Sequence, residues 1–329
     1  MISKRKVYFR ADADRSIGFG HFIRSLALAD MLKDEFDCTF FTQLPTAYQK
    51  EEVCKICKLV ELPVGNAKFS LFLDALQGDE IVFLDNYFFS SEYQRLVKEK
   101  GCKLVCIGGN DRHYYSDILI NYTDIEPENF SVEYYTKFCL GIDWALLRSP
   151  FWSVEGVERL IPKKVNSVAV CFGGTDPLAV TEMVVQHLQK KFHGIGIHII
   201  ATDSFGLDRI ECLLRGGVSV HTNVSAQEIA TVFRSVDVAV LAASSVALEA
   251  LALRTPVIAG YYIDNQKGIY RALEERNYIL GVGNLLDSLA GERIVKCIKR
   301  LPAEQVNKLV FNLSSIKNKY IHLFEGLCS

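Results

Sequence analysis

The sequence predicts an α/β protein with two consecutive parallel-sheet domains. Three observations lead to this prediction. Short β-branched and aromatic segments alternate with longer helical patterns, which is typical of βαβ units. The alternation restarts after a stretch without clear periodicity. At 329 residues the chain also exceeds the usual size of one hydrophobic core. Hydrophobic residues make up 49% and charged residues 23%, so a globular chain is expected rather than a disordered one.

Residues 1–150 form the first predicted domain. Its first expected helix, 22–33, places Ile23, Leu26 and Met31 at helical spacing, which gives it one apolar face. The expected strands are 7–11, 38–41, 81–84, 104–107, 118–120 and 138–140, and the second expected helix is 91–100.

The pattern changes after Arg148. Residues 151–166 carry several charges and no clear period, so we interpret them as a linker. A second domain is expected over 167–300 and terminal helices over 301–329. Ligands of open parallel sheets bind beyond the carboxyl ends of the strands, so two such sheets predict a site in a cleft between the domains. The strands expected in the second domain are 168–172, 197–201, 218–222, 238–241, 257–260 and 279–282.

Charge and cysteine content argue against several classes of protein. Lys and Arg number 37 against 39 Asp and Glu, a net charge of −2, which does not favour a nucleic-acid or anionic-membrane surface. We recognise neither a membrane span nor a secretory signal. The ten cysteines are interpreted as reduced, and the one CxxC, Cys54 with Cys57, has no further ligand at metal spacing. We therefore expect a cytoplasmic protein without metal or cofactor.

The first candidate site follows the first strand. Asp12 ends this strand, Gly18 and Gly20 form a glycine-rich turn, and His21 begins a helix. Such a turn brings backbone N–H groups close to an anionic ligand, and the helix dipole favours a neutral imidazole. A neutral imidazole facing a cleft suits a general base near pH 7. The alternative is that His21 only caps or packs the turn.

Two turns of the second domain have residues suited to phosphate. Gly173 and Gly174 follow its first strand and allow close approach of the main chain, and Thr175 can donate to a phosphate oxygen. An ordinary tight turn is the alternative there. Ser244 and Ser245 begin a later helix, where hydroxyls and first-turn N–H groups suit a diphosphate.

Glu249 lies one turn further into that helix, in an otherwise apolar sequence. Its carboxylate could accept hydrogen bonds from two ribose hydroxyls, while a solvent-facing glutamate is the alternative. Three weaker signals, each more often structural, are Asp85-Asn86-Tyr87 at a strand end, Arg148 beside the linker and Asn265 after another strand.

Taken in order, these stretches resemble the UDP-sugar hydrolases of the pseudaminic acid pathway, a family related to MurG-like GT-B glycosyltransferases. The resemblance is collinear and covers most of residues 5–285. It rests on FRADADRSIGFGHFIRSLALAD at 9–30, LDNYFFS at 84–90, HYYSDILIN at 113–121, GIDWALLRSPF at 141–151, CFGGTDPLAVT at 171–181 and AASSVALEALALRTPVIAGYYIDNQ at 242–266.

The resemblance implies a GT-B fold, two Rossmann-like domains facing each other across a cleft, with UDP held mainly by the second. It implies that His21 activates water to attack the anomeric carbon of UDP-2,4-diacetamido-2,4,6-trideoxy-β-L-altropyranose with inversion, releasing UDP by C–O cleavage without a catalytic metal. The implied partner is this small molecule alone, with no nucleic acid and no membrane insertion, and a monomer is expected. The expected site residues are catalytic His21 and Tyr87 and substrate-binding Asp12, Gly18, Gly20, Arg148, Gly173, Gly174, Thr175, Ser244, Ser245, Glu249 and Asn265.

The chain departs from the family pattern at three places in the first domain. Gly108-Gly109-Asn110 stands where many members have paired acidic residues, Asn86 replaces a histidine, and Phe88 replaces a glycine. These departures bear on the sugar more than on the nucleotide. Two alternatives remain: an inverting GT-B glycosyltransferase, in which His21 would deprotonate an acceptor hydroxyl, and a catalytically silent nucleotide-sugar-binding protein.

Overall fold

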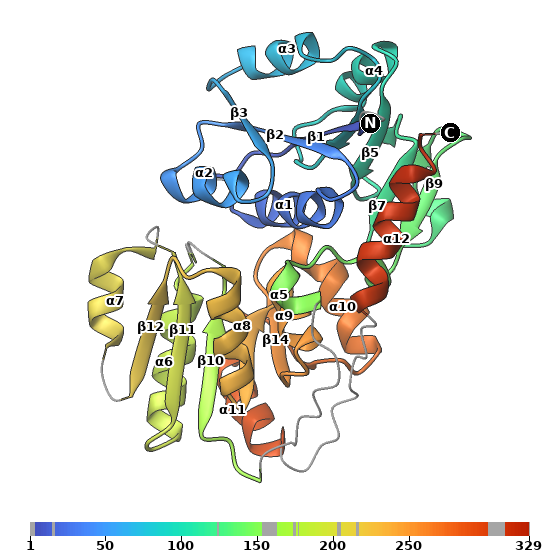
Figure 1. The fold of residues 1–329 in the computed structure, drawn as a ribbon. Coiled ribbons are helices and arrows are strands. Elements are labelled where there is room, and N and C mark those ends of the chain that lie inside the picture. The colour runs from blue at the N-terminus through green and yellow to red at the C-terminus, as the bar shows by residue number, and fades with distance from the viewer. Residues whose placement is uncertain are drawn as a thin grey trace. The chain divides into compact units, whose positions relative to one another are not determined.

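The chain forms two compact units, each with its own parallel sheet (Figure 1). Unit 1 comprises Met1–Ser149 with Ser314–Ser329, and unit 2 comprises Pro150–Leu313. The α/β class predicted from the sequence is confirmed. The structure, a computed structural model, describes residues 4–14, 17–123, 125–152, 163–173, 176, 178–202, 205–214, 217–301 and 313–328.

Unit 1 is built on a seven-stranded sheet in the order β3-β2-β1-β4-β5-β7-β9, with parallel neighbours throughout. The first strand lies between the second and the fourth, so the order reverses beside it. Arg10 pairs with Leu84, and the loops that follow β1 and β4 therefore leave the sheet side by side. The strands are β1 (Lys6–Arg10), β2 (Asp37–Gln43), β3 (Lys58–Leu62), β4 (Ile81–Leu84), β5 (Lys103–Ile107), β7 (Ile118–Asn121) and β9 (Lys137–Leu140), with a small separate pair, β6 (His113–Tyr114) and β8 (Ser131–Val132).

Aromatic side chains fill both faces of this sheet. Phe22 of the first helix packs against Phe40, their ring centroids 5.3 Å apart, and Phe40 stacks on Phe9. The next residue, Phe41, points the other way and meets Phe72 at 4.9 Å, as the period of two in a strand requires. The helices of this part of the chain are α1 (Gly20–Leu32), α2 (Ala47–Cys54), α3 (Ala67–Asp74) and α4 (Ser91–Glu99), with the 3-10 turns η1 (Pro127–Asn129) and η2 (Ile142–Trp144).

Capping residues start two of the outer helices but not α1. Thr46 and Gln49 form a capping box at α2, with each side chain accepting a hydrogen bond from the other residue's N–H. Ser90 accepts from the N–H of Tyr93 at the start of α4. In the described part of the chain, no side chain at the N-cap of α1, Phe19, bonds to that helix. The first turn of α1 therefore keeps N–H groups that a side-chain cap would otherwise satisfy.

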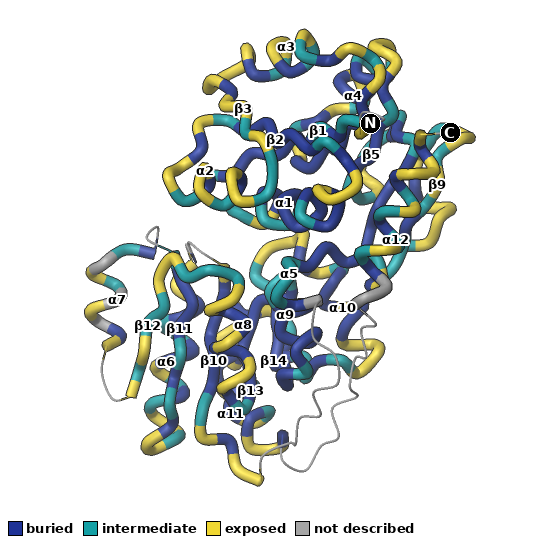
Figure 2. The backbone as a smooth tube through the Cα atoms, in the orientation of Figure 1, coloured by how far each residue is buried: buried dark blue, intermediate teal, exposed yellow. Residues whose placement is uncertain are grey.

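Unit 2 has a six-stranded sheet of order β12-β11-β10-β13-β14-β15, parallel throughout. As in unit 1, its first strand lies between its second and its fourth. Its central strands are buried along most of their length (Figure 2). The strands are β10 (Ser167–Cys171), β11 (Gly196–Ala201), β12 (Val218–Thr222), β13 (Val238–Ala242), β14 (Val257–Tyr261) and β15 (Leu280–Asn284), and the helices are α5 (Ser149–Trp152, at the boundary of the units), α6 (Val180–Lys191), α7 (Leu207–Leu213), α8 (Ala226–Ser235), α9 (Ser245–Ala252), α10 (Lys267–Glu275) and α11 (Ala290–Arg300), with the 3-10 turn η4 (Asp264–Gln266).

The chain ends on unit 1, through α12 (Leu313–Glu325). The fully buried Tyr320 donates a hydrogen bond to the carbonyl of Trp144 at 2.5 Å. Phe324 packs edge-on against Phe36, with ring centroids 6.1 Å apart. This helix confirms the terminal helix expected from the sequence, while residues 302–312 lie outside the described residues.

All twelve strands expected from the sequence are present, with ends shifted by a residue or two. The elements not expected from the sequence include α2, β3 and α3, which are consecutive along the chain, and the short strands β6 and β8. Most of the expected linker, residues 153–162, lies outside the described residues.

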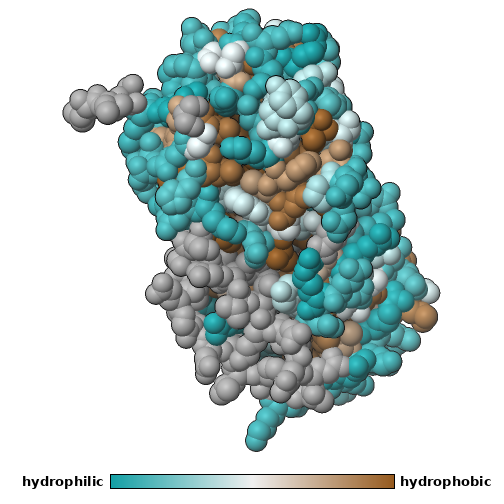
Figure 3. Space-filling model, turned by 90° about the vertical axis from the view of Figure 1, so that its right-hand side faces the viewer, coloured by the Kyte–Doolittle hydropathy of each residue, from teal (hydrophilic) through white to brown (hydrophobic). Residues whose placement is uncertain are grey.

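The cysteines behave largely as expected. Cys102, Cys106, Cys139 and Cys171 are buried, and none of the cysteines whose side chains are described forms a disulfide. Within the described residues there is no helix of the length and apolarity that a membrane crossing needs, and no group of three metal-ligating side chains. The face drawn in Figure 3 is mostly hydrophilic, with hydrophobic residues gathered mainly in its upper half.

Candidate active site

The candidate catalytic residues lie where β1 and β4 end at the carboxyl edge of the unit 1 sheet. β1 leads through a glycine turn into α1, whose second residue is His21. Gly18 has φ +81°, and a Cβ there would meet no atom within 4 Å. Its backbone conformation, rather than crowding, therefore favours glycine. Gly20 is the first residue of α1 and is equally uncrowded.

Asp85, the first residue after β4, orients the imidazole of His21. Nδ1 of His21 lies 2.7 Å from Oδ1 of Asp85, and the histidine is only 5% exposed. An ionised carboxylate can only accept, so Nδ1 carries the proton and the lone pair resides on Nε2. No described group forms a hydrogen bond to Nε2 of His21. This tautomer leaves Nε2 able to take a proton from a substrate or a water molecule.

Arg24, one turn into α1, keeps Asp85 ionised. Its Nε and Nη2 each lie 2.5 Å from a different carboxylate oxygen of Asp85. Burial acts to raise the pKa of Asp85, but the charge of Arg24 and the hydrogen bonds from Arg24 and His21 outweigh it and lower that pKa to about 2. Arg24 Nη2 is also 3.0 Å from Nδ1 of His21, and because both nitrogens carry protons this contact follows from their shared acceptor, Asp85.

Tyr87 lies beside the histidine and is open to solvent. Its ring meets that of His21 edge-on, with centroids 4.5 Å apart and planes at 85°. The tyrosine is 58% exposed, so a ligand approaching the imidazole would meet its phenol. Arg112 fixes this loop by donating from Nη1 to the carbonyls of Tyr87 and Phe89, at 2.9 and 2.8 Å.

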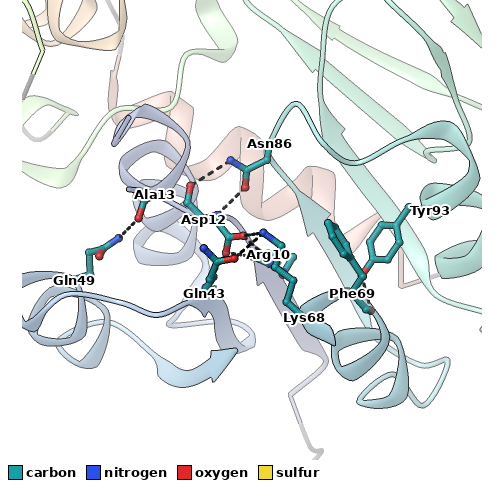
Figure 4. A network of polar contacts seen from close by, with 9 residues as sticks. All are labelled: Arg10, Asp12, Ala13, Gln43, Gln49, Lys68, Phe69, Asn86 and Tyr93. Atoms are coloured by element: carbon teal, nitrogen blue, oxygen red, sulfur yellow. Dashed lines mark hydrogen bonds and ion pairs between the residues drawn. The ribbon is translucent and has the colours of Figure 1, made fainter. Parts of the chain in front are cut away.

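Asp12 is occupied by protein donors. Its carboxylate pairs with the buried Arg10, accepts from Nζ of Lys68 at 2.8 Å and accepts from the N–H of Gln43 at 2.7 Å (Figure 4). The residue is 1% exposed. This predicted substrate-binding carboxylate is thus buried, and it accepts hydrogen bonds from protein groups that include the main chain of β2 at Gln43.

Gly108, the first of the departures after β5, has a local structural reason. A Cβ at this position would lie 2.0 Å from the hydroxyl of Tyr114, which no real contact permits. The Tyr114 hydroxyl donates to Asp111 at 3.3 Å, so a carboxylate is present nearby, three residues further along the chain.

The predicted diphosphate loops of unit 2 share one sheet edge. Gly173, Ser244 and Asn265 follow β10, β13 and β14, which are consecutive neighbours in the sheet. Gly173 has φ +93°, a conformation that favours glycine. Tyr262 donates to the carbonyl of Phe172 and so ties the loop after β14 to the loop after β10. Gly174 and Thr175 lie outside the described residues.

Helix α9 carries the rest of the predicted nucleotide set. Ser244 is its N-cap and Ser245 its first residue, and in the described structure the Ser244 side chain makes no capping bond to the helix. Glu249 is 3% exposed, which rules out the solvent-facing alternative. Of the remaining predicted residues, Asn265 is exposed in η4 and Arg148 is half-buried just before α5.

The predicted residues thus form two groups, one in each unit. His21, Tyr87 and the glycine turn, with Asp12 beneath them, belong to unit 1. From the sequence, Asp85 was only one of three weaker signals, and neither Asp85 nor Arg24 was expected in the site. The signal for Asp85 was its place directly after a buried strand, and its pairing with His21 depends on the adjacency of β1 and β4.

Comparisons with known proteins show which proteins the chain resembles. No family model matches the sequence. The chain is 26% identical over 285 residues to the UDP-2,4-diacetamido-2,4,6-trideoxy-beta-L-altropyranose hydrolase of Campylobacter jejuni, covering 83% of this chain and 97% of that protein. The resemblance inferred from the sequence motifs is confirmed.

Solved structures show the fold. HepE of Anabaena in complex with UDP-glucose superposes with a TM-score of 0.63 at 11% identity, covering 98% of this chain and 99% of that one. MurG of Acinetobacter baumannii superposes with a TM-score of 0.62 at 10% identity, with the same coverage. The chain has the GT-B fold.

Proposed function

We propose that this GT-B protein hydrolyses UDP-2,4-diacetamido-2,4,6-trideoxy-β-L-altropyranose to UDP and the free sugar, as a step of pseudaminic acid biosynthesis. One observation carries the catalytic part of the proposal. His21 donates a hydrogen bond from its Nδ1–H to Asp85, which leaves Nε2 available beside the exposed Tyr87. The choice of substrate is supported by the relative that bears this name.

In the proposed reaction, Nε2 of His21 removes a proton from a water molecule. The water oxygen forms a bond to the anomeric carbon while the bond from that carbon to the phosphate oxygen breaks. UDP leaves with the electron pair, the configuration inverts, and the proton stays on His21. The ionised Asp85 stabilises the resulting imidazolium. A nucleoside diphosphate is a good leaving group, so little acid catalysis is needed.

Unit 2 is proposed to hold the UDP. The first N–H groups of α9, with Ser244 and Ser245, can donate to the diphosphate, and Gly173 allows the neighbouring main chain to approach it. Glu249, buried one turn further along, can accept hydrogen bonds from the ribose hydroxyls. These are neutral donors and a single carboxylate, which is compatible with a net charge of −2.

Turnover of the UDP-sugar in ¹⁸O-labelled water tests the proposal. We expect one labelled oxygen in the released sugar and none in UDP, because attack is at carbon. Label in UDP would mean attack at phosphorus and would contradict the mechanism. Absence of turnover until an acceptor is added would favour the inverting glycosyltransferase, the activity class of MurG-like relatives of this fold.

A further inference from the structure

Asn86 separates Asp85 from Tyr87, and both of these residues contact the ring of His21. Its side chain binds the main chain of Asp12 (Figure 4). Oδ1 accepts from the Asp12 N–H at 2.7 Å, and Nδ2 donates to the Asp12 carbonyl at 3.2 Å. Asn86 is 8% exposed, so both ends of its amide are used inside the protein.

We infer that Asn86 is a positioning residue, which aligns His21 with Asp85 and Tyr87 and does not touch the sugar. This inference rests on the proposed function for its kinetic consequence, although its structural part stands alone. Asp12 lies in the loop between β1 and α1 that leads to His21, and Asn86 lies in the loop after β4 that carries Asp85 and Tyr87. The Asn86 amide therefore joins the loop that leads to His21 to the loop that carries Asp85 and Tyr87.

The Asp12 end of this connection is held firmly. Three donors from β1, β2 and α3 converge on its carboxylate: Arg10, the N–H of Gln43 and Nζ of Lys68. A buried carboxylate with two cations and a backbone donor has its lone pairs satisfied, so it is costly to move. The Asp12 main chain is thus a fixed reference for the Asn86 amide.

The same cations also contact the other loop. Nζ of Lys68 lies 4.3 Å from the ring centroid of Phe88, and the Arg10 guanidinium lies 5.6 Å from that of Phe89. Both are within the range of cation–π attraction. Lys68 therefore binds Asp12 on one loop and Phe88 on the other. Phe88 and Asn86 both depart from the family pattern. Both also link the loop after β4 to Asp12, Asn86 directly and Phe88 through Lys68.

The expected kinetic effect follows from geometry. Misplacing a catalytic group by about 1 Å can cost about 100-fold in rate. Removal of the Asn86 amide leaves a buried N–H and a buried carbonyl of Asp12 without this partner, and the loop can shift to satisfy them. We expect kcat to fall by about 10- to 100-fold in Asn86→Ala, with KM for the UDP-sugar changed less than about threefold.

A spectroscopic readout separates this inference from the proposed function. In protein labelled with ¹⁵N-histidine, the Nδ1–H of His21 that is held by Asp85 should give a low-field proton resonance, assigned by its loss in His21→Gln. We expect Asn86→Ala to shift or broaden this resonance. Asn121→Ala is the matched control, because Asn121 is also 8% exposed and also bridges two strand-end loops, through Nδ2 to the Gly108 carbonyl. It should leave the resonance in place.

Kinetics then test whether the rate loss of Asn86→Ala arises through His21. If Asn86 acts through His21, the rate loss of Asn86→Ala should vanish in a His21→Ala background. An unaltered His21 resonance, a raised KM with unchanged kcat, or a loss that adds fully to that of His21→Ala would overturn the inference. If Asn86→Ala does not fold, Asn86→Asp replaces it, because the aspartate keeps an acceptor for the Asp12 N–H. An unaltered His21 resonance together with a large increase in KM in Asn86→Asp would also overturn the inference. If the wild type shows no hydrolysis, the proposed function fails while the resonance still tests Asn86.

Discussion

At the scale of single residues, the chemistry depends on which nitrogen of His21 carries the proton. Asp85 sets this, because its carboxylate can accept from Nδ1 but cannot donate to it. Arg24 keeps that carboxylate charged and is its second hydrogen-bond donor, beside His21. The three residues form one unit, and the role of His21 as a base depends on the other two.

Replacing Asp85 by asparagine should therefore stop catalysis without removing His21. An amide that donates to Nδ1 would move the imidazole proton to Nε2, the wrong tautomer for a base. We expect kcat for the UDP-sugar to fall by about 10³- to 10⁴-fold, the effect known for such a change in a catalytic triad. Steady-state kinetics measure it.

Asp117→Asn is the control for this prediction. Asp117 also accepts from a cation, Lys98, and from a backbone N–H, that of Leu104, at another strand of the same sheet. We expect its kcat to stay near that of the wild type. A kcat for Asp85→Asn within about tenfold of the wild type would show that His21 does not need this tautomer.

The individual residues differed in how far the sequence could identify them. His21 and Glu249 stood out because a histidine at a glycine turn and a glutamate in an apolar helix both need a reason. The pairing of His21 with Asp85 spans 64 positions and depends on β4 lying next to β1. No local pattern contains that strand order, so the orienting residue could not be assigned from the sequence.

At the scale of elements, the strands with the strongest signal in the sequence are those buried on both faces, such as β4, β7 and β13. β3 was missed because it is an edge strand with mostly exposed side chains, including Val60 at 37%. Its sequence, KLVEL, shows neither the alternation of a half-buried strand nor the apolar run of a fully buried one. The start of α2, although not predicted, has a signal in the sequence, because Thr46 and Gln49 have the spacing of a capping box.

The edge strand of unit 2 carries a pH-sensitive contact. Nε2 of His221 on β12 lies 3.1 Å from Nδ1 of His198 on β11, and the rings stack at 5.4 Å. Burial, and then the charge of His198, lower the pKa of His221. A histidine with a lowered pKa binds fewer protons in the folded state than in the unfolded chain. The free energy of unfolding should therefore decrease as the pH falls through about 6.5.

We predict that His221→Gln weakens this pH dependence. The wild type should lose stability between pH 7 and pH 5, and the variant should lose less, because glutamine has no proton to gain. Urea unfolding at both pH values measures the difference. His113→Gln, a change to a histidine of unit 1, serves as the control. Equal slopes for His221→Gln and the wild type would show that the pair does not couple protonation to folding.

At the scale of the whole molecule, the proposed tasks divide between the two units. The residues assigned to proton transfer all lie in unit 1, and those assigned to the nucleotide all lie in unit 2. Each group occupies the carboxyl edge of a sheet whose first strand lies between its second and fourth. The chain nevertheless returns to unit 1 through α12, so the units are not simply the two halves of the sequence.

This division predicts opposite effects for two alanine variants. His21→Ala should reduce turnover to a small residual rate and leave UDP affinity unchanged, since the imidazole belongs to unit 1. Glu249→Ala should weaken UDP binding by about 10- to 100-fold, the cost of about 1.5–3 kcal/mol for a hydrogen bond to a charged group, with a smaller effect on kcat. Glu228→Ala, an exposed glutamate that caps α8, should change neither. Calorimetric titration with UDP and single-turnover kinetics measure the two quantities. Loss of UDP binding in His21→Ala would contradict the assignment of the base to the sugar side, and full affinity in Glu249→Ala would remove that residue from the ribose.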